Sequence, residues 1–238
     1  MLFLDYDGTL APFRPDPYQA YPYPGVIERL NRLSRLPCRL ALVTGRAVEA
    51  ILPLLRGLEP LPEIWANHGM EVLRPNGERR VYPTDPKGRE LLEKAKKWID
   101  AQGWDLIYEA KPTSIALHWR GRSTEEQRQF KEAVEAKFKE LSQSGVVYLL
   151  PFDGGMELRV KGRTKGDVVR EVLEEEGSLP AAYLGDDITD EDAFEAISGR
   201  GMGILVRKSW RDTKAQGWLI PPRELLWFLD MWIMHLGR

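Results

Sequence analysis

Short apolar segments that end in polar residues, each followed by a helical pattern, constrain the fold of this 238-residue chain more than any other feature. Such segments have the length and composition of buried strands, and the residues after them repeat at helical spacing. This alternation predicts a doubly wound α/β fold with a parallel sheet, in which ligands bind beyond the carboxyl ends of the strands. The expected strands cover residues 2–4, 39–43, 181–184 and 201–206, and the expected helices cover residues 25–36, 47–55, 165–176 and 225–236.

The middle of the chain follows a different pattern. Charged amphipathic helices are expected at residues 87–101 and 124–141, and short alternating strands at residues 114–119, 146–150 and 156–160. Helices combined with antiparallel strands are typical of a separate α+β unit. We therefore predict a core made of residues 1–80 and 161–238, with a smaller α+β cap, residues 81–160, inserted between its two parts.

Composition argues against several classes of partner. Lys and Arg (34) nearly balance Asp and Glu (36), so no net basic field is present to hold a nucleic-acid backbone. The most apolar segment, residues 225–236, contains Asp230 and is shorter than the roughly 18 residues of a membrane-spanning helix. Cys38 is the only cysteine, and the apolar run at the start stops at Asp5, too early for a signal peptide. We expect a cytoplasmic protein, monomeric rather than oligomeric, without nucleic-acid or membrane partners.

Two acidic residues, Asp5 and Asp7, follow the first expected strand in the sequence Asp-Tyr-Asp-Gly-Thr. Two carboxylates so close to a strand end are costly to bury unless a cation or a proton lies between them. An Asx-type turn is the alternative, because Asp-Gly occurs in many turns. The choice depends on what the other strands carry at the same edge of the sheet.

A second acidic cluster, residues 185–192, follows the strand expected at residues 181–184. Thr189 or Asp190 could cap the next helix, and Glu191 could favour its dipole. Capping does not account for Asp186 and Asp187 together. Because Mg²⁺ prefers carboxylate oxygens, the cluster favours a site for a hard divalent cation.

Two further segments could contact an anionic oxygen. Thr44, Gly45 and Arg46 follow the second strand and supply a hydroxyl and backbone amides, a geometry that suits an anion but is also that of an ordinary N-cap. Lys165 begins the helix at residues 165–176, although a single lysine is usually a solvated surface group. Each segment alone leaves both interpretations open.

Taken together and in chain order, these four clusters resemble the motifs of the haloacid dehalogenase (HAD) superfamily. The resemblance implies a HAD-like core in which Asp5 attacks phosphorus and forms an aspartyl-phosphate, while Asp7 acts first as acid and then as base. Thr44 and Lys165 would hold the phosphoryl oxygens while charge develops on them. The Mg²⁺ site that the resemblance implies consists of Asp5, the main-chain carbonyl of Asp7 and Asp186, with Asp187 and Asp190 nearby.

Longer segments resemble the trehalose-6-phosphate phosphatases of that superfamily. Residues 184–194 (Leu-Gly-Asp-Asp-Ile-Thr-Asp-Glu-Asp-Ala-Phe) look like the extended fourth motif of that family, and residues 67–71 (Asn-His-Gly-Met-Glu) are similar to another of its segments. Further matching stretches lie at residues 111–114, 118–120 and 157–159. The resemblance implies Mg²⁺-dependent hydrolysis of a small molecule, trehalose 6-phosphate. The substrate-binding residues that it implies are Gly45, Arg46, His68, Glu71, Lys111, Ser114, His118, Arg120 and Glu157.

Strand periodicity separates the cap residues onto two faces. Ser114 and His118 share one face of the strand at residues 114–119, so we expect them to face the substrate. The apolar set on the other face is expected to pack inward, and it consists of Ile115, Leu117 and Trp119. Packing is also a better expectation than sugar stacking for Trp98, Trp104 and Trp119.

Several alternatives stay open at this point. His118 could be a structural histidine, and Arg120 could belong to a surface ion pair. A related phosphatase could act on sucrose phosphate, mannosylglycerate phosphate or a monosaccharide phosphate. A phosphomutase would have to retain the phosphoryl group and transfer it again. A non-catalytic sugar-phosphate sensor is less favoured, because none of the expected catalytic positions is substituted.

Overall fold

The computed structural model describes residues 1–104, 107–152, 154–177 and 180–237. The chain divides into two compact units, one made of Met1–Tyr82 and Arg163–Arg238 and the other of Pro83–Gly162. We refer to them as the core and the cap. The chain passes from the core to the cap after residue 82 and back after residue 162. Each point lies two residues later than the sequence predicted.

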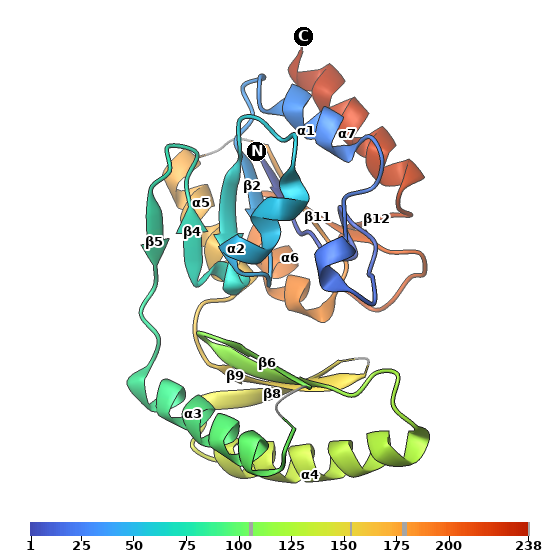
Figure 1. Cartoon of the computed structure of the whole chain (residues 1–238). Helices are drawn as coiled ribbons and strands as arrows, with labels where there is room; N and C mark the ends of the chain where they lie inside the picture. Colours follow the sequence, from blue (N-terminus) through green and yellow to red (C-terminus); the bar gives the residue numbers. More distant parts are fainter. Residues whose placement is uncertain (105–106, 153, 178–179, 238) are drawn as a thin grey trace. The chain divides into compact units, whose positions relative to one another are not determined.

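The core contains an eight-stranded sheet in the order β12-β11-β10-β1-β2-β3-β4-β5 (Figure 1). The first six strands in this order are parallel, and β4 and β5 continue the sheet in antiparallel pairing. The parallel α/β sheet predicted from the sequence is therefore confirmed. Its strands are β1 (Leu2–Leu4), β2 (Leu40–Val43), β3 (Glu63–Ala66), β4 (Glu71–Leu73), β5 (Arg79–Val81), β10 (Ala181–Gly185), β11 (Gly201–Val206) and β12 (Gly217–Leu219).

Helices bury both faces of β1, which explains why its sequence is apolar without alternation. Leu4 packs in one apolar cluster with residues of α1, α2 and α7, whereas Phe3 packs in a second cluster with residues of α5 and α6. The helices are α1 (Val26–Leu33), α2 (Val48–Ile51), α5 (Lys165–Glu176), α6 (Glu191–Ile197) and α7 (Arg223–Leu236), with short 3₁₀ helices at Pro17–Gln19, Leu52–Leu55, Asn67–Gly69 and Ile188–Asp190.

The helix expected at residues 47–55 is shorter than predicted. Only Val48–Ile51 is α-helical, and the 3₁₀ helix Leu52–Leu55 continues from it. Pro53 has no amide hydrogen to donate within an α-helix and its ring crowds the preceding turn, so the change of geometry at this point is expected.

The cap is an antiparallel sheet, in the order β6-β7-β9-β8, with two helices (Figure 1). The apolar residues Ile115, Leu117 and Trp119 pack with residues of both helices, and Trp98 and Trp104 lie against the same cluster, as predicted. The elements are α3 (Pro86–Ala101), β6 (Tyr108–Lys111), β7 (Ser114–His118), α4 (Thr124–Ser142), β8 (Val147–Phe152) and β9 (Gly155–Val160).

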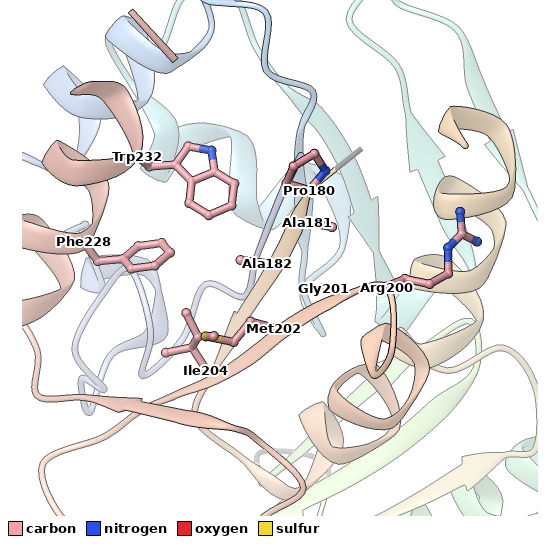
Figure 2. A pocket seen from close by; sticks show the side chains of 9 residues that line it. All are labelled: Pro180, Ala181, Ala182, Arg200, Gly201, Met202, Ile204, Phe228 and Trp232. Carbon is pink, nitrogen blue, oxygen red and sulfur yellow. The ribbon is translucent and has the colours of Figure 1, made fainter. Parts of the chain in front are cut away.

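A pocket of about 400 Å³ lies at the opposite edge of the core sheet from the polar clusters. Phe228 and Trp232 of α7 face the first residues of β10 and β11 across it (Figure 2). Those residues form the amino ends of parallel strands, so the pocket is separate from the edge where Asp5 and Asp186 lie. Among the described helices, none combines the length and apolar composition needed to cross a membrane.

Candidate active site at the carboxyl ends of the core strands

Asp5 follows β1 directly and is buried. Its amide donates to the carbonyl of Leu184 on β10 (2.9 Å), so sheet pairing continues up to the carboxylate. Asp5 Oδ1 accepts a hydrogen bond from Lys165 Nζ at 2.7 Å, and Asp5 Oδ2 accepts one from Thr9 Oγ1 at 3.1 Å. Lys165, on the first turn of α5, is also buried and is therefore not the solvated lysine of the alternative interpretation.

Asp190 is saturated with hydrogen-bond donors. Its Oδ1 accepts from Lys165 Nζ (2.7 Å) and from the hydroxyl of Tyr183 (2.6 Å). Its Oδ2 accepts from the backbone amides of Asp186 and Asp187, both at 3.0 Å. Because four donors converge on it, Asp190 fixes the loop that carries Asp186 and also the position of Lys165.

The surroundings of the site favour the charged form of Lys165 and disfavour the charged forms of Asp5 and Asp186. Burial lowers the pKa of Lys165, but the carboxylates of Asp190 and Asp5 raise it by more, so its ammonium stays protonated. Burial, together with Asp5 and Asp190, raises the pKa of Asp186 well above its ordinary value. Burial also raises the pKa of Asp5, with Lys165 opposing the shift. The single positive charge of Lys165 does not neutralise the three carboxylates of Asp5, Asp186 and Asp190.

The charge excess fits a cation site. Asp5, Asp186 and Asp190 each offer a carboxylate oxygen, and these oxygens lie within 4.8 Å of one another. All three residues are buried, where unpaired carboxylates are strongly disfavoured. A bound divalent cation would offset that cost, so these residues could hold a metal ion.

Gly8 allows the two acidic loops to come together. It has a left-handed φ of 83°, and a Cβ at this position would lie 2.1 Å from Asp186 Oδ2. Any other residue would be strained and would push Asp186 away. The Asp-Gly pair is therefore more than a turn, because the missing side chain leaves room for the carboxylate of the neighbouring loop.

Asp7 is held by Arg46 through a bidentate pair. Arg46 Nη2 donates to Asp7 Oδ1 (2.6 Å) and Arg46 Nε donates to Asp7 Oδ2 (2.7 Å). The Asp7 side chain remains 29% exposed, in contrast to the buried Asp5. Arg46 also donates to the carbonyl of Pro17 (2.9 Å), so it joins the loop after β2 to the loop after β1.

The loop of Thr44 and Gly45, after β2, lies against His68 in the 3₁₀ helix after β3. The buried Thr44 hydroxyl accepts from the amide of Arg46 (3.1 Å), and the Thr44 carbonyl accepts from the amide of His68 (2.9 Å). A Cβ on Gly45 would lie 2.5 Å from His68 Nε2, so the imidazole lies directly over this glycine. His68 reaches this position with a left-handed φ of 57°.

Glu71 lies on β4 of the core, in the buried part of the sheet. It accepts a hydrogen bond from Asn67 Nδ2 (3.2 Å) and pairs with Arg79 of β5. Asp187 is exposed; its amide donates to Asp190 Oδ2 (3.0 Å), and its carbonyl accepts from the amide of Asp190 (3.0 Å). The structure thus brings Asp5, Asp186 and Asp190 together, whereas the described contacts of Glu71 are with Asn67 and Arg79.

The remaining candidates lie on one face of the cap sheet. The register opposes Lys111 to Ser114, and Glu157 to Ala116, on the face away from the apolar cluster. Ser114 and Glu157 are buried, whereas the side chain of His118 is 48% exposed. Arg120 follows the end of β7 and lies against Gly154, where a Cβ would be 2.7 Å from Arg120 Cβ.

Several contributing residues were missed from the sequence. Tyr183 lies inside an apolar strand, where nothing in the sequence indicates that its hydroxyl donates to a carboxylate. Thr9 was part of the first motif but was assigned no contact with Asp5. Arg159 could have been found from strand parity, because it lies two residues after Glu157 on the strand expected at residues 156–160. Glu109 lies opposite Ala116 on the same cap face, but on β6, a strand that the sequence did not predict.

The sequence profile of the trehalose-phosphatase family matches residues 3–217, which is most of the chain. The chain belongs to the trehalose-phosphatase family. A family member, trehalose-phosphate phosphatase B of Arabidopsis thaliana, is 29% identical over 259 residues, which cover 97% of this chain and 65% of the relative. The chain therefore spans 65% of the length of this plant phosphatase.

Solved structures place this trehalose-phosphatase family member in the HAD fold. A crystal structure of a trehalose-6-phosphate phosphatase related protein superposes with a TM-score of 0.76 at 28% identity, covering 98% of this chain and 97% of that one. A haloacid dehalogenase-like hydrolase from Bacteroides thetaiotaomicron shares the fold at 16% identity, with a TM-score of 0.74 over 97% of this chain and 98% of that one. The trehalose-phosphatase resemblance seen in the sequence is confirmed, and so is the fold that the superfamily resemblance implies.

Proposed function

We propose that this protein hydrolyses trehalose 6-phosphate to trehalose and inorganic phosphate through an aspartyl-phosphate on Asp5. The observation that carries the proposal is the bond between Lys165 and Asp5 in the buried acidic group of a trehalose-phosphatase family member. A buried carboxylate with a fixed cation beside it is suited to attack an anionic phosphoryl group.

Two displacements at phosphorus account for the reaction. In the first, a carboxylate oxygen of Asp5 bonds to phosphorus, the bond from phosphorus to the sugar oxygen breaks, and Asp7 gives that oxygen a proton. In the second, water attacks the phosphorus of the aspartyl-phosphate, Asp7 takes the proton of the water, and the carboxylate of Asp5 is regenerated. The partial exposure of Asp7 supports this role, because an acid and base must be reachable by substrate and water.

Thr44 and Lys165 would stabilise the phosphoryl oxygens during both steps. Lys165 is already fixed by Asp190, so its charge needs no reorganisation when the phosphoryl group arrives. The loop of Thr44, Gly45 and Arg46 supplies a hydroxyl and backbone amides. Arg46 would keep Asp7 in place through the bidentate pair.

Asp5, the main-chain carbonyl of Asp7 and Asp186 are the residues that would hold Mg²⁺. When bound, the ion would reduce the repulsion between Asp5 and the dianionic phosphoryl group. Asp187 lies farther out. Because both oxygens of Asp190 carry hydrogen bonds, we assign Asp190 to positioning Lys165 and the Asp186 loop.

The cap face would recognise the sugar. Sugar hydroxyls require acceptors and donors held in fixed positions, and Lys111, His118 and Glu157 on this face are of the right types. Arg120 at the end of β7 and Ser114 within it add donors. The core residues Glu71 and His68 are further candidates for substrate binding, as the family resemblance implies.

The proposal is tested by measuring phosphate release with Mg²⁺ from trehalose 6-phosphate, sucrose 6-phosphate, glucose 6-phosphate and acetyl phosphate. We expect kcat/KM for trehalose 6-phosphate to be at least about tenfold above the other sugar phosphates, as recognition of specific hydroxyls allows. A higher value for sucrose 6-phosphate or glucose 6-phosphate would assign the protein to another sugar phosphate. Binding without phosphate release would identify a sensor.

The metal requirement is tested with the same assay. Removal of divalent cations by EDTA should abolish turnover, and excess Mg²⁺ should restore it. Asp186→Asn should raise the Mg²⁺ concentration needed for half-maximal activity. Unchanged turnover in EDTA would contradict the metal assignment.

A further inference from the structure

One row of the cap sheet carries two aromatic rings on either side of a glycine. The register opposes His118 of β7 to Gly155 of β9, and Gly155 to Phe152 of β8. Opposed residues point to the same face of a sheet, so both rings lie on the face away from α3 and α4. The ring centroids of His118 and Phe152 are 5.2 Å apart.

Gly155 is the reason that the two rings can meet. A Cβ on this residue would lie 2.0 Å from Phe152 Cζ, which means that the phenyl ring lies across the glycine backbone. The ring therefore lies over the middle strand and reaches toward the imidazole on the far side. Phe152 nevertheless remains 38% exposed, so part of its ring is left in contact with water.

The neighbouring rows on this face carry charged residues next to Ala116 and Leu150. Glu157 pairs with Arg159 at 2.7 Å, and Glu109 lies 3.6 Å from Lys111 and 3.8 Å from His118. The face thus has a charged part and an aromatic part side by side. A pyranose ring has the same two kinds of surface, since its hydroxyls lie around the edge and its C–H groups form an apolar face.

We propose that His118 and Phe152 form a shelf that packs against the apolar C–H face of a sugar ring, and that Phe152 is a specificity-determining residue. This inference rests on the proposed function and deepens it. The charged rows bind the hydroxyls, and the shelf removes the apolar face of the sugar and the exposed phenyl ring from water. A phosphate ester without a sugar ring gains nothing from the shelf.

The test compares trehalose 6-phosphate with acetyl phosphate, which has no ring, in the wild type and in Phe152→Ala. The variant should raise KM for trehalose 6-phosphate about three- to tenfold, the range of a single aromatic contact, with kcat nearly unchanged. Its kcat/KM for acetyl phosphate should stay within about twofold of wild type, since core residues carry the chemistry. Phe152→Tyr keeps the ring and should restore KM.

Two controls separate recognition from stability. Trp227 on α7 is 59% exposed. Trp227→Ala removes an exposed ring from the core and should leave KM unchanged for both trehalose 6-phosphate and acetyl phosphate. Phe152→Leu keeps an apolar side chain without a flat ring. It should melt at the wild-type temperature and still show the raised KM.

An unchanged KM in Phe152→Ala would overturn the shelf, and so would an equal loss on acetyl phosphate. A wild type that prefers another sugar phosphate would overturn the proposed substrate but not the shelf. In that case the comparison is made with the preferred sugar phosphate, for which the same selective rise in KM is expected. A wild type that hydrolyses no sugar phosphate would overturn both.

Discussion

Charged groups are held in opposite ways in the core site and on the cap sheet. In the core, the side chains of Lys165 and Asp190 are 3% and 0% exposed, and four donors converge on Asp190. On the cap, the side chains of His118 and Glu109 are 48% and 53% exposed, and His118 Nε2 lies 3.8 Å from Glu109 Oε2. The buried network has one geometry, whereas the exposed pairs can exchange partners at little cost.

This difference matches two different tasks. Transfer of a phosphoryl group requires charges that are already in place before the transition state forms. Recognition of a sugar requires groups that can give up a weak ion pair and take a hydroxyl in its place. We therefore expect changes in the network of Asp5, Lys165 and Asp190 to affect every substrate equally, and changes on the cap face to affect sugar phosphates selectively.

The largest effect is expected from Asp5→Asn. The amide cannot act as the nucleophile, so kcat should fall by at least about 10⁴-fold on both trehalose 6-phosphate and acetyl phosphate. The fold should persist because Lys165 keeps its bond to Asp190. Activity near the wild-type level in a folded Asp5→Asn variant would end the nucleophile assignment.

A smaller but still large effect is expected from Lys165→Met. Removal of the ammonium leaves Asp5 and Asp190 buried without their shared cation, which should reduce the free energy of unfolding by about 3–5 kcal/mol. Turnover should fall about 10²–10³-fold on both substrates, because a phosphoryl-binding charge is lost. Lys214→Met is the matched surface control and should change neither property; urea unfolding and kinetics together decide the result.

A selective effect is expected from Glu157→Ala on the cap. Loss of this carboxylate should raise KM for trehalose 6-phosphate about tenfold, as expected when hydroxyl partners are left unpaired, and should spare acetyl phosphate. Arg159→Ala removes the ion-pair partner of Glu157, so its KM for trehalose 6-phosphate can be compared with that of Glu157→Ala. Equal losses on the two substrates would remove Glu157 from sugar recognition.

The smallest effect on catalysis is expected from Glu63→Gln. Glu63 is buried at the start of β3 between Arg39 (2.9 Å) and Arg74 (3.0 Å), at the edge of the core sheet opposite Asp5. Loss of its charge should lower the free energy of unfolding by about 1–3 kcal/mol. The turnover number per folded molecule should stay unchanged. A change in KM for trehalose 6-phosphate would show that the amino ends of the core strands also affect the active site.

Elements with a strong local pattern could be predicted from the sequence. The helix Lys165–Glu176 and the strand Gly201–Val206 have the bounds that were expected. β5 (Arg79–Val81) was missed because it is three residues long, exposed along its length and begins with two arginines. β6 was missed because Glu109 and Lys111 interrupt any apolar pattern.

The acidic motifs could be located from sequence, but their individual contacts could not. The sequence offered Asp190 as a possible helix cap and could not assign contacts to Asp186 or Asp187. Only the folded loop shows that Asp190 accepts four hydrogen bonds while Asp187 is exposed. Arg46 was expected to bind substrate, and its bidentate pair with Asp7 depends on how two loops meet. Such contacts join residues far apart in the chain, which local patterns do not encode.

The central claim is that one nucleophile, Asp5, serves every substrate while the cap face selects the sugar. The direct measurement is to quench the enzyme with acid during turnover of trehalose 6-phosphate, and separately of acetyl phosphate, and to locate the phosphoryl group by peptide mass spectrometry. We expect it on Asp5 with both substrates, and not in Asp5→Asn. A phosphoryl group on another residue, or none with either substrate under conditions of rapid turnover, would contradict this account.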